Sequence, residues 1–479
     1  MGAWVREISK EQLQARMRTE NPWWRGEGIG WELEALTPRA YFDLFFPLVT
    51  ELSVRRAIVL MGPRRVGKTV LIHHAVQRLL AEGVAPRQIA YVSADHPLYH
   101  DLGLEDLVEL YREASGADRT TTAYVFFDEV QYQKDWEVHL KALVDQERDL
   151  RITVSGSAAA ALSRKSHESG AGRFTDFLLP PLTFYEYMEL IDQGELLRGV
   201  ERDGRSLFEA RDLPALNDHF LHFLNFGGYP EVVFSETIQA NPARFIKGDI
   251  IDKVLLRDLP SLYGISDVQE LNKLFTTLAF NTANELSLQD LSSNSGVAKN
   301  TIKRYIEYLE AAFLIRVVHR VDESARRFRR ARSFKVYLTN PSMRAALFAP
   351  VGADAPEVGA LAETAVLSQY FHDEAADLFY SRWKKGEVDL VRLNAAQRPV
   401  WAVEVKWSDR FVRRPGDLDA LLDFCHRNDL SQGWATTRTV RRTTSRNQVT
   451  IRFIPTSELC YTVGYNIIRG RGLESSDLP

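Results

Sequence analysis

The chain of 479 residues is too long for one ordinary hydrophobic core, so we expect about two to four domains. Its hydrophobic fraction of 45% and charged fraction of 26% are typical of a soluble globular protein, and no apolar run is long enough to span a bilayer. The formal net charge of −4 neither requires nor excludes nucleic acid, so any such binding must rely on local basic patches.

Residues 1–40 are expected to form an N-terminal extension without a signal-peptide pattern. The chain has two cysteines, Cys425 and Cys460, and their spacing does not suit a metal, which favours the reducing cytoplasm. Trp23 and Trp24 follow a proline, a pattern that more often ties a terminus to a core than stacks on a base. We therefore predict that Trp23 is packed.

Residues 41–185 alternate strand-like and helix-like patterns, which predicts a parallel α/β sheet. The apolar run 57–61 leads into a stretch that fits G-x-x-x-x-G-K-[ST], the phosphate-binding loop of P-loop NTPases, and a helical rhythm follows over 70–80. Backbone amides of such a loop and the helix N-terminus surround phosphate oxygens, while the lysine reaches the β- and γ-phosphates and the threonine hydroxyl ligates Mg²⁺. The predicted ATP-binding residues here are Gly62, Pro63, Arg64, Arg65, Val66, Gly67, Lys68, Thr69 and Val70.

A second motif follows at residues 123–129, where an apolar strand pattern ends in the paired carboxylates Asp128 and Glu129. This Walker B pattern places Asp128 beside the Mg²⁺ that Thr69 would hold. Glu129 is then positioned to polarise the attacking water. The alternative is that both acids are solvated strand ends, which an upstream phosphate loop disfavours.

A further apolar strand pattern, 151–157, ends in the hydroxyls of Ser155 and Ser157. Together these motifs resemble AAA+-type ATPases, and more narrowly the prokaryotic ATPases that carry a winged helix and a C-terminal nuclease-like domain. Gly172-Arg173-Phe174 and the runs 179–186 and 227–231 extend the resemblance. It implies that Ser155 or Ser157 contacts the γ-phosphate or the attacking water, and that Arg173 is an arginine finger or senses nucleotide. An Arg173 acting in trans would require a homo-oligomer, and an ordinary surface role for it stays open.

Residues 186–265 have mainly helical patterns and occupy the position of an AAA+ lid. Over 266–340, two helical patterns separated by a turn precede two strand patterns, an order that resembles a winged helix. DNA phosphates could contact the basic residues of its second helix and wing, which are Lys299, Lys303, Arg304, Arg326, Arg327, Arg329 and Arg330. The alternative is a winged helix that only connects domains.

Residues 341–470 show the order helix, three strands, helix, strand, with an acidic residue on one strand and E-x-K on the next. This αβββαβ pattern resembles PD-(D/E)xK nucleases. Alternate residues of a strand share one face, so Glu404 and Lys406 point into one site. Asp389 and Glu404, with Glu363 from the helix, could ligate Mg²⁺ or Mn²⁺, and Lys406 would activate water or stabilise transition-state charge. The tail 471–479 is expected to fray.

The leading hypothesis is therefore an AAA+-type ATPase whose nucleotide cycle controls a DNA-binding winged helix and a nuclease-like domain. By resemblance alone, such a protein suits defence against foreign DNA. Two alternatives remain, and both concern the C-terminal region. In the first, the protein is a nucleotide-switched DNA-binding or signalling protein whose nuclease-like domain is inert. In the second, that domain recruits a partner protein.

Overall fold

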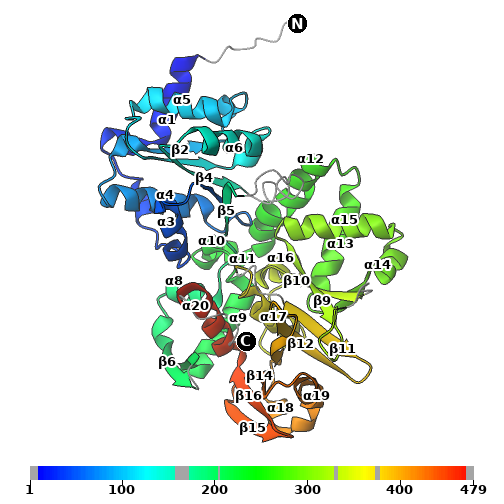
Figure 1. Cartoon of the computed structure of the whole chain (residues 1–479). Helices are drawn as coiled ribbons and strands as arrows, with labels where there is room; N and C mark the ends of the chain where they lie inside the picture. Colours follow the sequence, from blue (N-terminus) through cyan, green and yellow to red (C-terminus); the bar gives the residue numbers. More distant parts are fainter. Residues whose placement is uncertain (1–8, 157–171, 203–204, 328–332, 373–377, 471–479) are drawn as a thin grey trace. The chain divides into compact units, whose positions relative to one another are not determined.

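The computed structural model describes residues 9–156, 172–202, 205–327, 333–372 and 378–470. The chain forms two compact units, Met1–Leu179 and Pro180–Pro479 (Figure 1). Over the described ranges, the helices are too short or too polar to cross a membrane.

The first unit is built on a five-stranded parallel sheet with the strand order β2-β3-β4-β1-β5. Most side chains of the four strands β1 to β4 are buried, because helices cover both faces, as parallel sheets require. The strands are β1 (Ala57–Met61), β2 (Ile89–Ser93), β3 (Ala123–Asp128), β4 (Leu150–Gly156) and β5 (Phe174–Leu178). The predicted parallel sheet is thus confirmed, with the strands within a few residues of the predicted ranges.

The helices of this unit lie on opposite faces of the sheet because the connections run in opposite directions. The step from β1 to β2 crosses the sheet one way, and the steps from β2 through β3 to β4 return, so right-handed crossovers place α4 opposite α5 and α6. Figure 1 shows α3 and α4 on one side of the strands and α1, α5 and α6 on the other. The bounds are α1 (Lys10–Glu20), α2 (Trp31–Glu34), α3 (Phe42–Thr50), α4 (Lys68–Ala81), α5 (Leu104–Ser115) and α6 (Trp136–Gln146).

The N-terminal segment is anchored to the edge strand β2, as the paired tryptophans predict. The side chain of Trp23 is 1% exposed, and its Nε1 donates to the carbonyl of Ile89 at 2.9 Å. Trp24 donates to the same carbonyl at 2.8 Å, and the Asn21 amide donates to the Tyr91 carbonyl and accepts from its N–H. The prediction of packing for Trp23 is confirmed.

The second unit begins with helices and a β-hairpin. The predicted 186–265 range is mainly helical, as expected, but the hairpin β6 (Leu197–Arg202) and β7 (Arg205–Ala210) interrupts it. Packing against α20, near the C-terminus, holds this hairpin. The helical segments up to residue 280 are α8 (Phe184–Leu190), α9 (Leu213–Phe226), α10 (Pro230–Val233), α11 (Glu236–Ala240), the π-helical η7 (Ala243–Asp252) and η8 (Val254–Asp258), α12 (Leu259–Tyr263) and α13 (Val268–Phe280).

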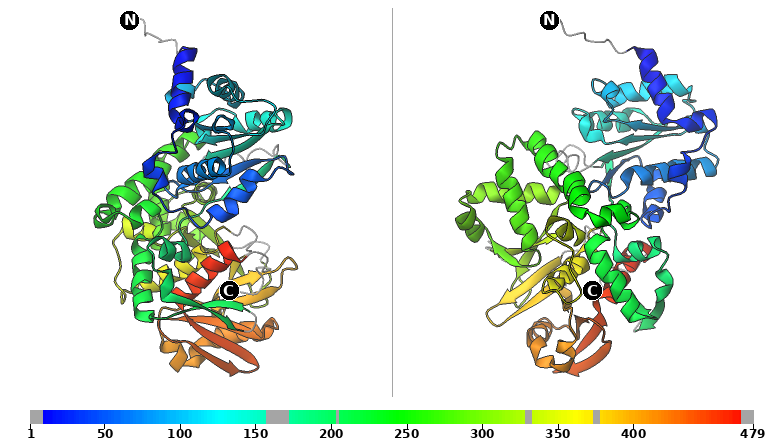
Figure 2. Two further views of the ribbon diagram at one scale, coloured as in Figure 1. Left: turned by 90° about the vertical axis from the view of Figure 1, so that its left-hand side faces the viewer. Right: turned by 180° about the vertical axis from the view of Figure 1, so that it is seen from behind.

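A nine-stranded sheet forms the centre of the second unit, in the order β15-β16-β14-β13-β12-β11-β9-β10-β8. Figure 2 shows its strands from green through yellow to orange-red. The strands are β8 (Glu285–Ser287), β9 (Ile315–Val321), β10 (Ser333–Leu338), β11 (Leu378–Trp383), β12 (Gly386–Leu393), β13 (Pro399–Glu404), β14 (Gln432–Thr437), β15 (Arg442–Arg446) and β16 (Val449–Pro455). The remaining helices are α14 (Leu288–Ser295), α15 (Lys299–Ala311), α16 (Ser342–Leu347), α17 (Val358–Ser368), α18 (Arg410–Arg413), α19 (Asp419–Arg427) and α20 (Thr456–Arg469).

This sheet joins two ranges that the sequence suggested as separate domains. Helices α14 and α15 precede strands β9 and β10, as predicted, whereas α13 and β8 lie before them and were not predicted. The Ser287 hydroxyl begins α14 by accepting from the Asp290 N–H at 3.0 Å. Helix α17, strands β11 to β13, helix α19 and strand β14 also follow the predicted order. However, β9 pairs in parallel with β11 through Phe379 and His319, so the sheet is continuous across residue 340.

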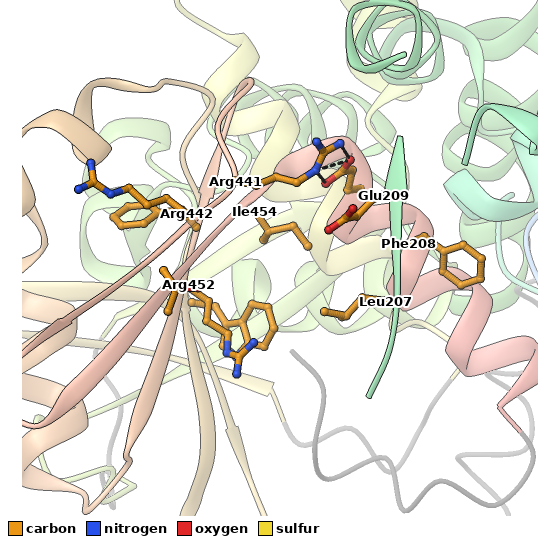
Figure 3. Close-up of a pocket in the computed structure, with 11 residues that line it drawn as sticks. Leu207, Phe208, Glu209, Arg441, Arg442, Arg452 and Ile454 are labelled. Atoms are coloured by element: carbon orange, nitrogen blue, oxygen red, sulfur yellow. Dashed lines mark hydrogen bonds and ion pairs between the residues drawn. The ribbon is translucent and has the colours of Figure 1, made fainter. Parts of the chain in front are cut away.

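The hairpin and the C-terminal strands line a partly open cavity of about 300 Å³. Figure 3 shows Leu207 and Ile454 facing each other across it, while Phe208 points away. Arg441 pairs with the buried carboxylate of Glu458, which also accepts from the Ala210 N–H at 2.6 Å. These contacts fasten the hairpin to α20, and the cavity contains none of the predicted site residues.

Candidate functional site

The predicted phosphate loop lies between β1 and α4 at the carboxyl edge of the parallel sheet. Two glycines shape it. A Cβ at Gly62 would lie 2.2 Å from the Leu179 carbonyl oxygen, which is backbone and cannot yield. Gly67 has φ +95°, a conformation that favours glycine, and α4 begins at the next residue. The loop therefore delivers its amides and the N-terminus of a 14-residue helix to one place.

Lys68, the first residue of α4, lies inside this loop. Its Nζ donates to the carbonyls of Gly62 at 3.0 Å and Pro63 at 2.9 Å, and the residue is 5% exposed. Burial lowers the pKa of Lys68, and the charges of Glu129 and Asp128 oppose that shift. Among the described residues this buried ammonium donates only to carbonyls, and it is suited to exchange them for phosphate oxygens.

Asp128, at the end of β3, accepts three hydrogen bonds from separate parts of the fold. The hydroxyl of Thr69 donates to Oδ2 at 2.6 Å, the Tyr91 hydroxyl donates to Oδ2 at 3.0 Å, and Ser155 donates to Oδ1. The parallel register places these residues together, because Ser93 of β2 is opposite Asp128 and β4 lies between β3 and β1. The sequence predicted Thr69, Asp128 and Ser155 at this site, and the structure brings them together.

The hydroxyl and carboxylate oxygens at this site fit Mg²⁺, which takes oxygen ligands and commonly only a few of them from the protein. Thr69 and Asp128 are the residues that would hold it, since a hydroxyl and a carboxylate already meet there. Glu129 follows directly with φ +58°, the left-handed region, and its backbone N–H donates to Ser155 Oγ at 3.3 Å. Gln131 donates a hydrogen bond to the Glu129 carboxylate. This unusual backbone conformation suits a residue whose side chain has to be held in one orientation toward the phosphate loop.

Three residues near the loop were not predicted. Arg39 is buried and donates to the Val66 carbonyl at 2.9 Å, which fixes the loop from outside. His73 bonds to the Thr69 carbonyl at 2.8 Å and packs against the Tyr91 ring. Burial, and then the Asp128 charge, raise the pKa of Tyr91, so its phenol stays protonated and donates. No local motif marks them, because each acts from a different element.

Other predicted residues lie apart from this cluster or outside the described ranges. The Arg64 side chain reaches the Tyr132 hydroxyl at 3.2 Å. Arg173 pairs with Asp145 at 2.8 Å, and its carbonyl accepts from Ala57 at the start of β1. Five strand residues at ~3.3 Å each separate that position from the loop by roughly 16 Å, so the chain does not bring its own Arg173 to its phosphate loop. Ser157 lies outside the described residues.

The basic residues that the sequence predicts to contact DNA are exposed where the structure describes them. Lys299, Lys303 and Arg304 lie on the outer side of α15, and Lys303 pairs with Glu307 at 3.7 Å. Arg326 and Arg327 are exposed after β9, while Arg329 and Arg330 fall outside the described ranges. Helix α15 begins at Lys299 after Ala298, so Asn300 lies inside it.

The predicted carboxylates of the C-terminal range converge on the nine-stranded sheet. Lys406 Nζ lies 3.2 Å from Asp389 Oδ2 and 2.7 Å from Glu404 Oε1. Glu363 of α17 lies beside them and accepts a hydrogen bond at its Oε1 from the Tyr337 hydroxyl at 2.6 Å. Burial and the Asp389 charge raise the pKa of both Glu363 and Glu404. Although burial opposes it, Lys406 and Lys335 keep the pKa of Asp389 lowered.

A second lysine, Lys335 of β10, enters this cluster and was not predicted. Its Nζ lies 2.9 Å from Glu363 Oε1, 2.8 Å from Glu387 Oε1 and 3.3 Å from Asp389 Oδ1. The carboxylates expected to bind metal are therefore bound by ammonium groups. Over the described ranges, no group of three or more His, Cys, Asp or Glu is arranged to hold a metal ion. The residues as placed do not fit the predicted Mg²⁺ or Mn²⁺.

Two family models match separate parts of the chain. Residues 54–188 match an AAA domain. Residues 217–355 match a domain of unknown function (DUF8612). The first match contains the phosphate loop, Asp128 and Ser155, whereas the second contains α13 to α15 and Lys335 but ends before Glu363.

Three uncharacterised proteins are similar in sequence. One from Methanocaldococcus jannaschii is 25% identical over 262 residues, covering 54% of this chain and 55% of the relative. One from Haemophilus influenzae is 26% identical over 264 residues, covering 53% and 60%. A second M. jannaschii protein is 22% identical over 360 residues, covering 71% and 73%. The chain thus spans between half and two thirds of the length of the first two relatives.

Solved structures show a weaker likeness. The Aeropyrum pernix ORC1 protein in complex with DNA has a TM-score of 0.33 at 12% identity, covering 68% of this chain and 95% of that chain. AMPPCP-bound DnaA from Aquifex aeolicus has a TM-score of 0.27 at 15% identity, covering 60% and 90%. The family match over residues 54–188, with the parallel sheet and loop described above, assigns to the first unit an AAA domain of the P-loop type.

Proposed function

We propose that this protein binds ATP with Mg²⁺ at the loop Gly62–Thr69 and hydrolyses it. One observation carries the proposal: the Thr69 hydroxyl and the Asp128 carboxylate meet at 2.6 Å beside the loop. Hydroxyl and carboxylate oxygens in this relation are the Mg²⁺ partners of P-loop NTPases. The AAA domain match over residues 54–188 supports it independently.

Each residue has a separable role in this proposal. The Lys68 ammonium gives up its hydrogen bonds to the carbonyls of Gly62 and Pro63 and binds the β- and γ-phosphates instead. Asp128 holds the Thr69 hydroxyl, and bound Mg²⁺ supplies charge neutralisation on the phosphates. Glu129 polarises the attacking water and takes up its proton as the water oxygen bonds to the γ-phosphorus. The bond from that phosphorus to the β,γ-bridging oxygen breaks in the same step, and ADP leaves. Ser155 keeps the ends of β3 and β4 in register through Asp128 and the Glu129 amide.

Two variants separate binding from hydrolysis. At ATP concentrations 100 times Kd, ligand binding stabilises by about 2.7 kcal/mol, and a unit of this size gains about 2–4 °C in Tm per kcal/mol. We therefore expect ATP and Mg²⁺ to raise the Tm of the first unit by about 5–11 °C. Lys68→Met should abolish this shift, because the ammonium that meets the phosphates is gone.

Glu129→Gln should keep the shift and lose phosphate release. Glu82→Gln is the matched control, since Glu82 is exposed beyond the far end of α4 and pairs with Arg78. An unchanged ATP-dependent shift in Lys68→Met would refute the binding site. Hydrolysis by Glu129→Gln at the parent rate would refute the assigned role of Glu129.

We further propose that the nucleotide state controls DNA binding by a winged helix formed by α13 to α15 and β8 to β10. The exposed cations of α15 support this, as does the order of helices and strands. Each phosphate neutralised contributes a salt slope of about −0.9. Alanine at Lys299, Lys303 and Arg304 should therefore flatten the logarithmic salt dependence of DNA affinity by about 2–3, while Lys273→Ala on α13 should change it little. A triple variant with the parent slope would refute this contact.

Metal-dependent nucleic-acid cleavage is the second candidate function. It is favoured by the convergence of Asp389, Glu404 and Lys406 on one sheet. It requires Lys335 to leave its carboxylates, because those oxygens are otherwise occupied. The arrangement described here therefore favours a nucleotide-switched protein whose nuclease-like region does not cleave in this state. Cleavage that appears with Mn²⁺ and disappears in Asp389→Ala would reverse that preference.

A further inference from the structure

Strand β10 brings Lys335 to the carboxylates through the continuous sheet. Lys335 lies opposite Val318 of β9, and β9 pairs with β11, whose other neighbour β12 contributes Glu387 and Asp389. Lys335 and Tyr337 are two positions apart on β10, so their side chains lie on the same face of the sheet. Both contact Glu363 of α17. The placement follows from strand order, since no short motif links residue 335 with residues 363 to 389.

The ammonium of Lys335 is fully engaged. Its Nζ lies 2.8–3.3 Å from oxygens of three carboxylates, and the side chain is 3% exposed. Buried carboxylates need a counter-charge, because desolvation otherwise costs several kcal/mol for each ion. Lys335 supplies one positive charge and Lys406 a second, at Asp389 Oδ2 and Glu404 Oε1. Two ammonium groups thus face four carboxylates, so groups of the chain itself compensate the cluster in part.

Lys335 and a divalent metal would compete for the same oxygens. Glu363 and Asp389, the two predicted ligands nearest β10, both face Lys335 Nζ. Mg²⁺ or Mn²⁺ would have to approach those oxygens more closely than an ammonium does, at about 2.0–2.1 Å for Mg²⁺. Oε2 of Glu404 is buried without a hydrogen bond to a described residue, but one oxygen does not make a metal site.

We propose that Lys335 is an internal counter-cation that takes the place of the divalent metal, so that the cluster is a closed salt-bridge network. As folded, it binds neither Mg²⁺ nor Mn²⁺. Glu363, Glu387 and Asp389 then serve to hold β10 and α17 against the C-terminal strands. Removal of the Lys335 charge opens the cluster, because the uncompensated carboxylates now attract an external cation.

The test measures Mn²⁺ binding directly, by electron paramagnetic resonance of free Mn²⁺, on the full chain without nucleotide. We expect parent and Asp389→Asn proteins to bind Mn²⁺ alike, since the cluster contributes no site. The Lys335→Met protein should bind Mn²⁺ at the cluster at least about 100-fold more tightly than the parent protein does. The double variant Lys335→Met/Asp389→Asn should lose this site again. Parent binding that disappears in Asp389→Asn would overturn the proposal, as would a folded Lys335→Met protein that gains no site.

Lys335→Met loses one partner of a buried network and could unfold. If it unfolds without metal but melts cooperatively with Mn²⁺, the proposal is supported. If it unfolds under both conditions, the comparison of parent with Asp389→Asn decides alone. The ATP-dependent rise in Tm is recorded on the same samples: its persistence in the Asp389→Asn protein and loss in Lys68→Met keep this test distinct from that of the ATP site.

Discussion

Tyr91 is expected to position Asp128 rather than to contact nucleotide, and Tyr91→Phe tests this with the loss of one oxygen. The phenol donates to Asp128 Oδ2 at 3.0 Å, and both residues are buried, at 8% and 2% exposure. A hydrogen bond to a charged group contributes about 1.5–3 kcal/mol. Loss of a partner that orients a metal ligand commonly lowers metal affinity or activity about 10–100-fold. Because about 1.4 kcal/mol corresponds to a tenfold change in an equilibrium constant, the loss of this hydrogen bond and the loss of metal affinity are of the same size.

We therefore expect the Mg²⁺ concentration for half-maximal ATP hydrolysis to rise about 10–100-fold in Tyr91→Phe. The measurement is an Mg²⁺ titration of phosphate release at fixed ATP, with a thermal melt of each protein. Tyr124→Phe is the matched control, because Tyr124 is equally buried on β3 and its hydroxyl makes no hydrogen bond to a described residue. An unchanged Mg²⁺ dependence in a folded Tyr91→Phe protein would show that Asp128 is oriented without Tyr91.

Two further predictions concern stability. Trp23→Ala should lower the free energy of unfolding of the first unit by about 3–5 kcal/mol, because a fully buried indole leaves a cavity; Trp31→Ala, 77% exposed, should change it by less than about 0.5 kcal/mol. Chemical denaturation measures both, and equal effects would contradict the anchoring of the N-terminus. Glu404 binds its proton more tightly in the folded chain, where its pKa is raised to about 8. Its protonation therefore stabilises the folded state fully below pH ~4.5, and this stabilisation is lost as the pH rises through about 8. The Tm of the second unit should therefore fall over that window, and Glu404→Gln should flatten the fall; an unchanged slope would show that Glu404 does not titrate there.

Much of the first unit could be predicted from the sequence because its signals are local. A buried strand, a glycine-bounded loop and a helix follow one another in the chain, so Gly62, Lys68 and Thr69 are recognisable without a fold. Asp128 is recognisable for the same reason, at the end of an apolar run. Tyr91 could not be predicted, since its role depends on the adjacency of β2 and β3 in the sheet and on a side chain that crosses to Asp128.

For the second unit, the sequence determined the kinds and order of the elements, and with them the alternation that aims Glu404 and Lys406 together. Only the tertiary structure decided their surroundings. The parallel pairing of β9 with β11 merges two predicted domains into one sheet and carries Lys335 to Glu363, Glu387 and Asp389. Strand order and register result from the packing of distant segments, which the pattern along one strand does not encode. A set of carboxylates that predicts a metal site is, in the folded chain, already paired with the ammonium groups of Lys335 and Lys406.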